Sequence, residues 1–478
     1  MRNLTTVFAV YGYFALSVAA LSLSGFTSSG QAQTLETLQH FTDKPDGAYP
    51  YAGLIADGKG ALYGTTYNGG TVTYGTVFKL TPPVNGKGAW TKSVINSFCQ
   101  SVSCIDGANP AANLVADPQG ALYGTTYNGG LHGYGAVFKL TPPGGSNGKT
   151  VWTETVPYNF TGGDDGAYPQ AGLIWRQGSL YGTAYEGGIG CGIYGCGTVF
   201  KLTPPPNDHT RWTYTAIYRF PGGDAGAYPL AGLIADEKGA LYGTTYNGGT
   251  IGVGTVFKLT PPANGESAWT ETILHDFSGG PPDVPYGTYP KAGLIADKKG
   301  ALYGTTYEGG GANLGTVFML TPPASGEGAW TPTVLHTFTY SNDDFVLDGG
   351  AYPMAGLIAG PQGALYGTTY NGGNNCWSDV DGNGCGTIFK LTPPAVGQIG
   401  WTKAVLHRFN GDDGAFPTGL IADPQGVLYG TTYEGGYVGT TLCHLNNGCG
   451  TVFKLTPGLD KGHASGQSAG TALTSTEN

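Results

Sequence analysis

The stretch GALYGTTYNGG at residues 60–70 decides the fold, because it returns along the whole chain. It recurs unchanged at 120–130, as GSLYGTAYEGG at 178–188, and in four further copies that end with GVLYGTTYEGG at 426–436. The Leu of the phrase falls at 62, 122, 180, 241, 302, 365 and 428, so the copies lie 58 to 63 residues apart. A steady period of this length indicates a repeat architecture, in which the whole array is one folding unit.

Each repeat contains four runs rich in β-branched and aromatic residues. In the first repeat the runs span 52–57, 61–67, 75–83 and 90–98, and clusters of Gly, Pro and Asn separate them. Runs of this kind between turn residues predict strands. Four strands in each of seven repeats predict an all-β fold, a single seven-bladed β-propeller with four antiparallel strands per blade.

The two ends of the array predict a closed ring. The last repeat stops after GTVFKLTP at 450–457 and lacks the fourth strand. The segment QTLETLQHF at 33–41 precedes the first repeat and matches the pattern of WTKSVINSF at 90–98. We therefore expect the N-terminal strand to complete the last blade, which removes the open edges that a solenoid would keep. The propeller is expected to span 33–457.

The phrases GLIAD, LYGTTY-x-GG and GTVFKL resemble the repeats of the Gloeo/Verruco (GloVer) tandem-repeat family of exported bacterial proteins. The resemblance covers about residues 34–457 and rests on motifs that recur seven times. It implies a propeller-type repeat and export, and it assigns no catalytic residue, because the family is known by its repeat. Members differ in their C-terminal anchoring segments. The tail of this chain, 458–478, has no apolar span and is expected to be disordered, which favours release over anchoring.

The N-terminus predicts export. Arg2 is followed by a mostly apolar stretch from Leu4 to Leu23 and then by small residues, an order typical of a signal peptide, here residues 1–32. An uncleaved membrane anchor is the alternative, because the apolar stretch is long enough to span a bilayer. We expect a periplasmic or extracellular monomer with no stable membrane insertion after cleavage.

Eight cysteines fall into four close pairs, which predicts local disulfides in an oxidising compartment. Zinc is disfavoured, because no CxxC pair is present. The pairs are Cys99 with Cys104, Cys191 with Cys196, Cys376 with Cys385, and Cys443 with Cys449.

Loop lengths vary on only one side of the predicted ring. With GLIAD as the innermost strand, all eight cysteines and every long insertion fall in the loops of one face, here called the top face. The ADxxG turns and the TPP loops form the opposite, bottom face and barely vary. Insertions on one face of a repeat protein often mark its binding face, so ligand contacts are expected on the top face.

The repeated DGAYP element supplies one set of candidate ligand-binding residues. A ring of Asp and aromatic side chains at the top face would suit a sugar or a cation. The alternative is turn chemistry, because Asp and Gly form turns and Pro begins a strand. The candidates are Asp46, Tyr49, Asp165, Tyr168 and Asp413.

The residue after the last Tyr of the phrase supplies a second set. It is Asn in four repeats and Glu in three, at Glu186, Glu308 and Glu434. Carboxylates that face a shared cavity could bind a cation or act on a glycosidic bond, but these would meet only if they point to the axis.

The segment DVDGNG between Cys376 and Cys385 suggests a calcium loop. Asp379, Asp381 and Asn383 match the opening D-x-D-x-N of such a loop. Lys390 stands at the twelfth position, which excludes a complete EF-hand. The alternatives are a partial Ca²⁺ site, the only cofactor expected here, and a hydrophilic loop closed by a disulfide.

The formal net charge is −10 without any run of Lys or Arg, which argues against a nucleic-acid partner. We expect an exported binding module for a glycan or another envelope or extracellular component. The alternatives are a carbohydrate-active enzyme (a polysaccharide lyase or glycosidase), a lactonase, or a purely structural surface protein. Converging acidic and aromatic side chains at the channel mouth would favour an enzyme, and a mouth of Gly, Thr and backbone would favour a binder.

Overall fold

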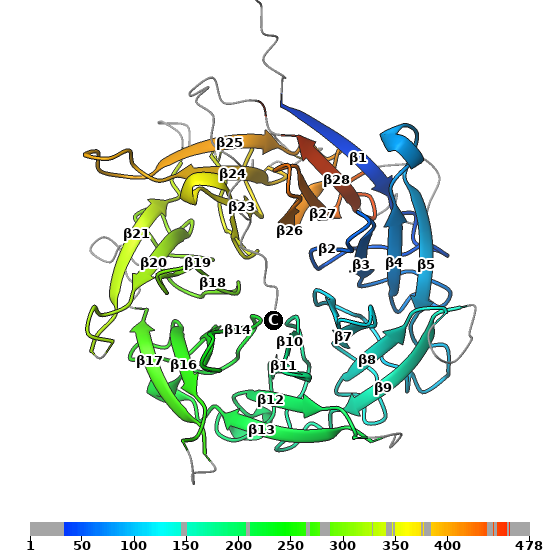
Figure 1. Cartoon of the computed structure of the whole chain (residues 1–478), viewed down its shortest axis with the longest axis horizontal. Helices are drawn as coiled ribbons and strands as arrows, with labels where there is room; N and C mark the ends of the chain where they lie inside the picture. Colours follow the sequence, from blue (N-terminus) through cyan, green and yellow to red (C-terminus); the bar gives the residue numbers. More distant parts are fainter. Residues whose placement is uncertain are drawn as a thin grey trace, which may run out of the picture.

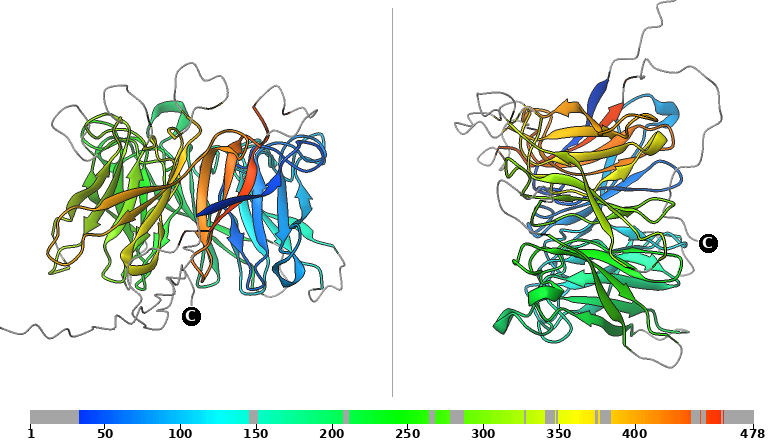
Figure 2. Two further views of the ribbon diagram at one scale, coloured as in Figure 1. Left: turned by 90° about the horizontal axis from the view of Figure 1, so that it is seen from above. Right: turned by 90° about the vertical axis from the view of Figure 1, so that its left-hand side faces the viewer.

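The computed structural model describes residues 33–144, 151–206, 211–263, 268–277, 287–326, 328–340, 347, 349–373, 376, 384–436, 443, 447–456 and 458. Within these ranges the chain forms seven four-stranded antiparallel sheets arranged as a ring (Figure 1). Seen from the side, the ring is a disc one blade thick (Figure 2). None of the described residues belongs to a helix long and apolar enough to cross a membrane.

Blade 1 shows the pattern of the other blades. From the axis outward it contains β2 (Ile55–Ala56), β3 (Leu62–Thr66), β4 (Thr76–Thr81) and β5 (Thr91–Ser97). All four runs expected from the sequence are strands, and GLIAD supplies the innermost one. Only two residues of GLIAD pair in β2, because Asp57 already forms the next turn and accepts bonds from the N–H groups of Lys59 and Ala61.

The next five blades repeat this order. Blade 2 contains β6 (Val115–Ala116), β7 (Leu122–Thr126), β8 (Ala136–Thr141) and β9 (Thr153–Asn159). Blade 3 contains β10 (Ile174–Arg176), β11 (Ser179–Ala184), β12 (Thr198–Thr203) and β13 (Thr213–Arg219). Blade 4 contains β14 (Ile234–Ala235), β15 (Leu241–Thr245), β16 (Thr255–Thr260) and β17 (Thr270–Asp276). Blade 5 contains β18 (Ile295–Ala296), β19 (Leu302–Thr306), β20 (Thr316–Thr321) and β21 (Thr331–Thr337). Blade 6 contains β22 (Ile358–Ala359), β23 (Leu365–Thr369), β24 (Thr387–Thr392) and β25 (Thr402–Arg408).

Blade 7 closes the ring, as the sequence predicts. Its inner strands are β26 (Ala415–Ala422), β27 (Leu428–Glu434) and β28 (Thr451–Thr456), and its outermost strand is β1 (Thr34–His40). β1 pairs antiparallel with β28, from Thr34 opposite Thr456 to His40 opposite Thr451 (Figure 1). Short 3-10 turns lie in the connections, at Val84–Gly86, Gly192–Tyr194, Gly223–Ala225 and Pro361–Gly363.

Two repeated contacts join each blade to the next. The first is a phenylalanine pair, in which the Phe after one blade's outermost strand meets the Phe in the third strand of the next blade. The ring centroids are 4.9 to 5.5 Å apart, and edge-on or tilted aromatic contacts at this distance are favourable. The pairs are Phe41–Phe78, Phe98–Phe138, Phe160–Phe200, Phe220–Phe257, Phe277–Phe318, Phe338–Phe389 and Phe409–Phe453.

The second contact is a buried hydrogen bond near the axis. A threonine in the second strand of each blade donates its hydroxyl to a backbone carbonyl just before the innermost strand of the next blade, at 2.7 to 3.5 Å. The bonds are Thr65–Ala112, Thr125–Ala171, Thr183–Ala231, Thr244–Ala292, Thr305–Ala355, Thr368–Pro417 and Thr431–Ala52. The last of these connects blade 7 to blade 1, so the ring of bonds closes.

The Gly of each LYGTT strand leaves room for a phenylalanine of the same blade. A Cβ on Gly64 would lie 2.6 Å from Cζ of Phe78 and 2.9 Å from Cδ2 of Leu54. We expect Gly64→Ala to lower the free energy of unfolding by about 1 to 3 kcal/mol, because the buried ring would have to move. Denaturant unfolding monitored by tryptophan fluorescence measures the change. Gly58→Ala is the control, because nothing lies within 4 Å of its Cβ; equal loss in both variants would contradict this explanation.

Candidate functional site

A pocket of about 530 Å³ opens on the ring axis. Residues from all seven blades line it; in blades 1 to 6 they lie just before the innermost strand or just after the second strand, and in blade 7 they lie at the corresponding ends of β26 and β27. Both positions are at the ends of strands that meet the top face, so the pocket is the upper end of the central channel. The lining that matters below comprises Tyr51, Asn113, Gln170, Leu230, Lys291, Tyr307, Met354, Tyr370, Thr418 and Tyr433.

Tyrosines line one half of this pocket. Tyr307, Tyr370 and Tyr433 are the last Tyr of the repeated phrase in blades 5, 6 and 7, and Tyr51 adds a fourth ring from blade 1. The Tyr51 and Tyr433 rings meet edge-on, with centroids 5.7 Å apart. Burial raises the pKa of Tyr370 and Tyr433 to about 12, and the nearby Glu434 carboxylate adds to this rise. The hydroxyls therefore remain protonated donors at neutral pH.

Glycine backbones form the narrow part of the pocket. A Cβ on Gly232 would lie 3.1 Å from the carbonyl oxygen of Gly172, and one on Gly293 would lie 3.3 Å from that of Gly232. Blade 2 carries Asn113 at this position, and its Oδ1 accepts a 2.6 Å hydrogen bond from the N–H of Gly53. A side chain at Gly232 or Gly293 would therefore press on the backbone of the preceding blade, whereas blade 2 accommodates Asn113.

The position between the Pro of AYP and the AGL sequence lines the pocket and varies in every repeat. Sequence reasoning missed it, although the signal was visible: one letter changes freely inside an otherwise constant phrase. Blade 7 reads FPTGL and is one residue shorter there. The position is occupied by Tyr51, Ala111, Gln170, Leu230, Lys291 and Met354 in blades 1 to 6.

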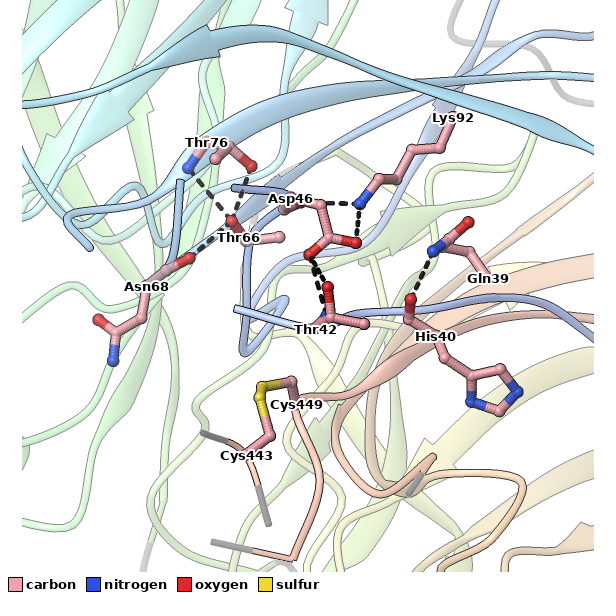
Figure 3. Close-up of polar contacts among 10 residues, drawn as sticks. All are labelled: Gln39, His40, Thr42, Asp46, Thr66, Asn68, Thr76, Lys92, Cys443 and Cys449. Atoms are coloured by element: carbon pink, nitrogen blue, oxygen red, sulfur yellow. Dashed lines mark hydrogen bonds and ion pairs between the residues drawn. A yellow bond between two sulfur atoms is a disulfide. The ribbon is translucent and has the colours of Figure 1, made fainter. Parts of the chain in front are cut away.

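The Asp candidates of the DGAYP element are held by their own loops. Asp46 accepts hydrogen bonds from the N–H of Thr42 (3.0 Å) and its hydroxyl (2.8 Å), and pairs with the Lys92 ammonium (Figure 3). Asp165 accepts bonds from the backbone N–H of Thr161 and from the Tyr158 hydroxyl at 2.8 Å. None of these carboxylates lines the axial pocket, and the contacts agree with turn chemistry. Asp413 has the same arrangement, with His407 Nε2 at 2.8 Å.

The Tyr candidates lie between blades at the top face. Tyr49 packs on Tyr433, with centroids 5.2 Å apart, and Tyr168 packs on Tyr127 at 5.1 Å. Both have left-handed backbone conformations, with φ of 57° and 53°. They therefore support the tyrosines of the repeated phrase from outside the pocket, and direct ligand contact by Tyr49 or Tyr168 stays a prediction.

The three Glu candidates stay near the tyrosines, each in its own blade. Glu186 and Glu308 form isolated bridges with the DGAYP-type segments, through backbone bonds to Ala167 and Thr288. Burial raises the pKa of Glu186 and of Glu434 above the ordinary value. The structure does not place any of the three among the residues that line the axial pocket. Their role in ligand binding stays a prediction.

All four expected disulfides are present, and each closes a top-face loop: Cys99–Cys104, Cys191–Cys196, Cys376–Cys385 and Cys443–Cys449. The calcium candidates Asp379, Asp381 and Asn383 lie outside the described residues. Among the residues that are described, no group of three or more His, Cys, Asp or Glu side chains could hold a metal ion.

Blade 2 replaces the ion pair of blade 1 by two acids. Lys92 and Asp46 of blade 1 correspond in the repeat to Glu154 and Asp106 of blade 2, and these two carboxyl groups line a second pocket of about 370 Å³. Oε1 of Glu154 and Oδ1 of Asp106 are buried and have no hydrogen-bond partner among the described residues. Burial raises the pKa of Glu154 to about 8, although the amide of Asn96 donates to it at 3.0 Å.

The protonated Glu154 predicts a pH dependence of stability. Its folded pKa of about 8 lies above the unfolded value of 4.5, so its contribution is complete below pH 4.5 and is lost as the pH rises to about 8. Unfolding free energies measured from pH 5 to 8 should fall less steeply for Glu154→Gln than for the wild type. Glu36→Gln, at a side chain that is 58% exposed, is the control. Parallel curves for wild type and Glu154→Gln would refute this assignment.

Glu154→Lys should rebuild the blade 1 ion pair in blade 2. We expect the variant to be about 1 to 3 kcal/mol more stable at pH 8, because a buried carboxyl without a full set of partners is exchanged for an ammonium that faces Asp106. Thermal unfolding would show the gain. The gain in stability should vanish in the double variant that combines Glu154→Lys with Asp106→Asn. If the double variant keeps the gain, the ion pair is not its cause.

The repeat matches one family. The family model described as the Gloeobacter/Verrucomicrobia repeat matches residues 24–193 and 190–441, so the chain belongs to this repeat family. No curated protein matches the chain.

Solved structures resemble the chain in fold. An ancestral GH74 enzyme is 13% identical, with a TM-score of 0.50, over 88% of this chain and 49% of that one. PorZ, a bacterial surface component of the type-IX secretion system of Porphyromonas gingivalis, is 14% identical, with a TM-score of 0.48, over 86% of this chain and 47% of that one. The PQQ domain of a pyranose dehydrogenase from Coprinopsis cinerea is 10% identical, with a TM-score of 0.37, over 89% and 95%. At 13% identity the likeness to the GH74 enzyme concerns the fold alone.

Proposed function

We propose that this member of the Gloeobacter/Verrucomicrobia repeat family is an exported glycan-binding module that holds a segment of sugar chain in the axial pocket. The observation that carries the proposal is the tyrosine half of that pocket, formed by Tyr51, Tyr307, Tyr370 and Tyr433. Ligand pockets usually combine apolar walls with a few polar groups and enclose about 300 to 1,000 Å³, and the axial pocket has this size and mixture.

Tyrosine suits a sugar for a physical reason. Its ring offers an apolar face to the C–H groups of a sugar ring, and its hydroxyl exchanges hydrogen bonds with sugar hydroxyls. Gln170 of blade 3 adds a further donor and acceptor on the opposite side of the pocket. The backbone beneath them is fixed by the inter-blade threonine bonds, so little conformational entropy would be lost on binding.

The pocket lining departs from both patterns expected from the sequence. It contains aromatic side chains, which a mouth of Gly, Thr and backbone would lack, and none of the described lining residues carries a carboxylate. Most glycosidases act through a pair of carboxyl groups at the scissile bond. The described lining therefore favours a binding module over a glycosidase of that kind.

Export is supported by two observations. Four disulfides close the top loops, and disulfides persist mainly in oxidising compartments outside the cytoplasm. The repeat family also points to an exported protein.

Tyr51→Ala should weaken glycan binding by about tenfold or more. Tyr51 lines the pocket, and its side chain is 41% exposed, so it can be removed with little loss of packing. A glycan array followed by isothermal titration calorimetry would measure the affinity. Tyr74→Ala is the matched control, because Tyr74 is equally exposed, at 44%, and lies outside the pocket.

Two outcomes would overturn the proposed function. One is the absence of binding to any glycan of the array by the folded wild type, and the other is equal affinity of the Tyr51 and Tyr74 variants. Reducing-end and ultraviolet assays on each bound glycan would detect hydrolysis or elimination. Turnover would support the enzyme alternative instead.

A further inference from the structure

The cationic residue of the axial pocket is Lys291, and it occupies the variable position of blade 5. Its ammonium lies 3.3 Å from the ring centroid of Tyr307 and 5.6 Å from that of Tyr246. Among the described residues no carboxylate oxygen lies within ion-pair distance of it. An ammonium can donate three hydrogen bonds, and aromatic faces accept only weakly. The pocket therefore holds a partly buried cation whose hydrogen-bonding capacity is not used.

The backbone around Lys291 is fixed by the neighbouring blade. Thr244 of blade 4 donates a hydrogen bond to the carbonyl of Ala292 at 3.2 Å. On the other side, Pro290 packs against Gly254, where a Cβ would lie only 2.6 Å from the proline Cδ. The side chain between these two anchors extends into the pocket. The fold does not require a lysine there, because Leu230 and Met354 occupy the same position in blades 4 and 6.

We propose that the variable positions select the glycan and that Lys291 selects a sugar bearing a carboxylate, a uronic acid. This inference rests on the proposed function. The carboxylate would accept hydrogen bonds from the Lys291 ammonium, and the sugar ring would lie against the tyrosines of blades 5, 6, 7 and 1. Burial lowers the pKa of Lys291, and the charge of Glu308 only partly opposes this effect. A charge that burial disfavours gains most from an anionic partner.

The test uses pairs of oligosaccharides that differ only at C6. At equal chain length, β-1,4-oligomannuronate is compared with β-1,4-manno-oligosaccharide, α-1,4-oligogalacturonate with α-1,4-galacto-oligosaccharide, and β-1,4-oligoglucuronate with cello-oligosaccharide. We expect the wild type to bind at least one acid about tenfold or more tightly than its neutral partner. This preference should weaken as the salt concentration rises, because the contact is between charges.

Lys291→Met should abolish the preference, because the acid loses its ionic contact; the neutral partner, which has no charge to lose, should weaken much less. The variant should fold normally, because the chain already accepts Met354 at the equivalent position. Lys59→Met removes the same charge from the bottom face and should keep the preference. Acetate at matched ionic strength should compete poorly, because it lacks the sugar ring.

The outcomes separate this inference from the proposed function. Neutral and acidic partners that bind equally, or a preference that survives Lys291→Met, would overturn the inference while glycan binding stands. No binding of any acid would also overturn it. A wild type that binds no sugar of either kind removes the basis of both.

Discussion

One buried hydroxyl per blade holds the ring together. The threonine in the middle of each second strand donates to the carbonyl that precedes the next blade's innermost strand, and the seventh of these bonds returns to the first blade. A buried carbonyl without a partner would be costly, so each blade needs its neighbour in register. The same carbonyl adjoins the residue that lines the axial pocket, as in Ala52 beside Tyr51. The contact that closes the ring therefore also places the side chains at the site.

Much of the architecture follows from the sequence because the repeat is regular. The seven blades, the closing N-terminal strand and the four disulfides are all confirmed. The innermost strands of blades 1 to 6 are shorter than expected, whereas β26 of blade 7 has eight residues; in blade 1 the side chain of Asp57 forms the turn that ends β2. Strand propensity alone does not reveal that competition.

The candidate site was harder to predict, for a physical reason. Asp46 and Asp165 carry the groups expected of ligand-binding residues, yet their carboxylates are held by partners near in sequence, Thr42 and Tyr158 respectively, and Lys92 adds an ion pair to Asp46. The pocket is lined instead by residue types that carry little chemical signal, such as Leu230 and Met354. The sequence feature that indicates the pocket is the one position that varies between otherwise constant repeats. The chemical type of the side chain does not indicate it.

The pairing of β1 with β28 also constrains how the molecule is made. Its partners, Thr34 and Thr456, come from opposite ends of the described chain. During synthesis the N-terminus emerges first, and six blades can form from hairpins that are local in sequence. β1, the outermost strand of blade 7, can pair only after β28 has been synthesised. Contacts this distant in sequence form slowly, because a very long loop must close first. We therefore expect ring closure to be the final folding event, with both flanks of the array exposing unpaired β-edges until then.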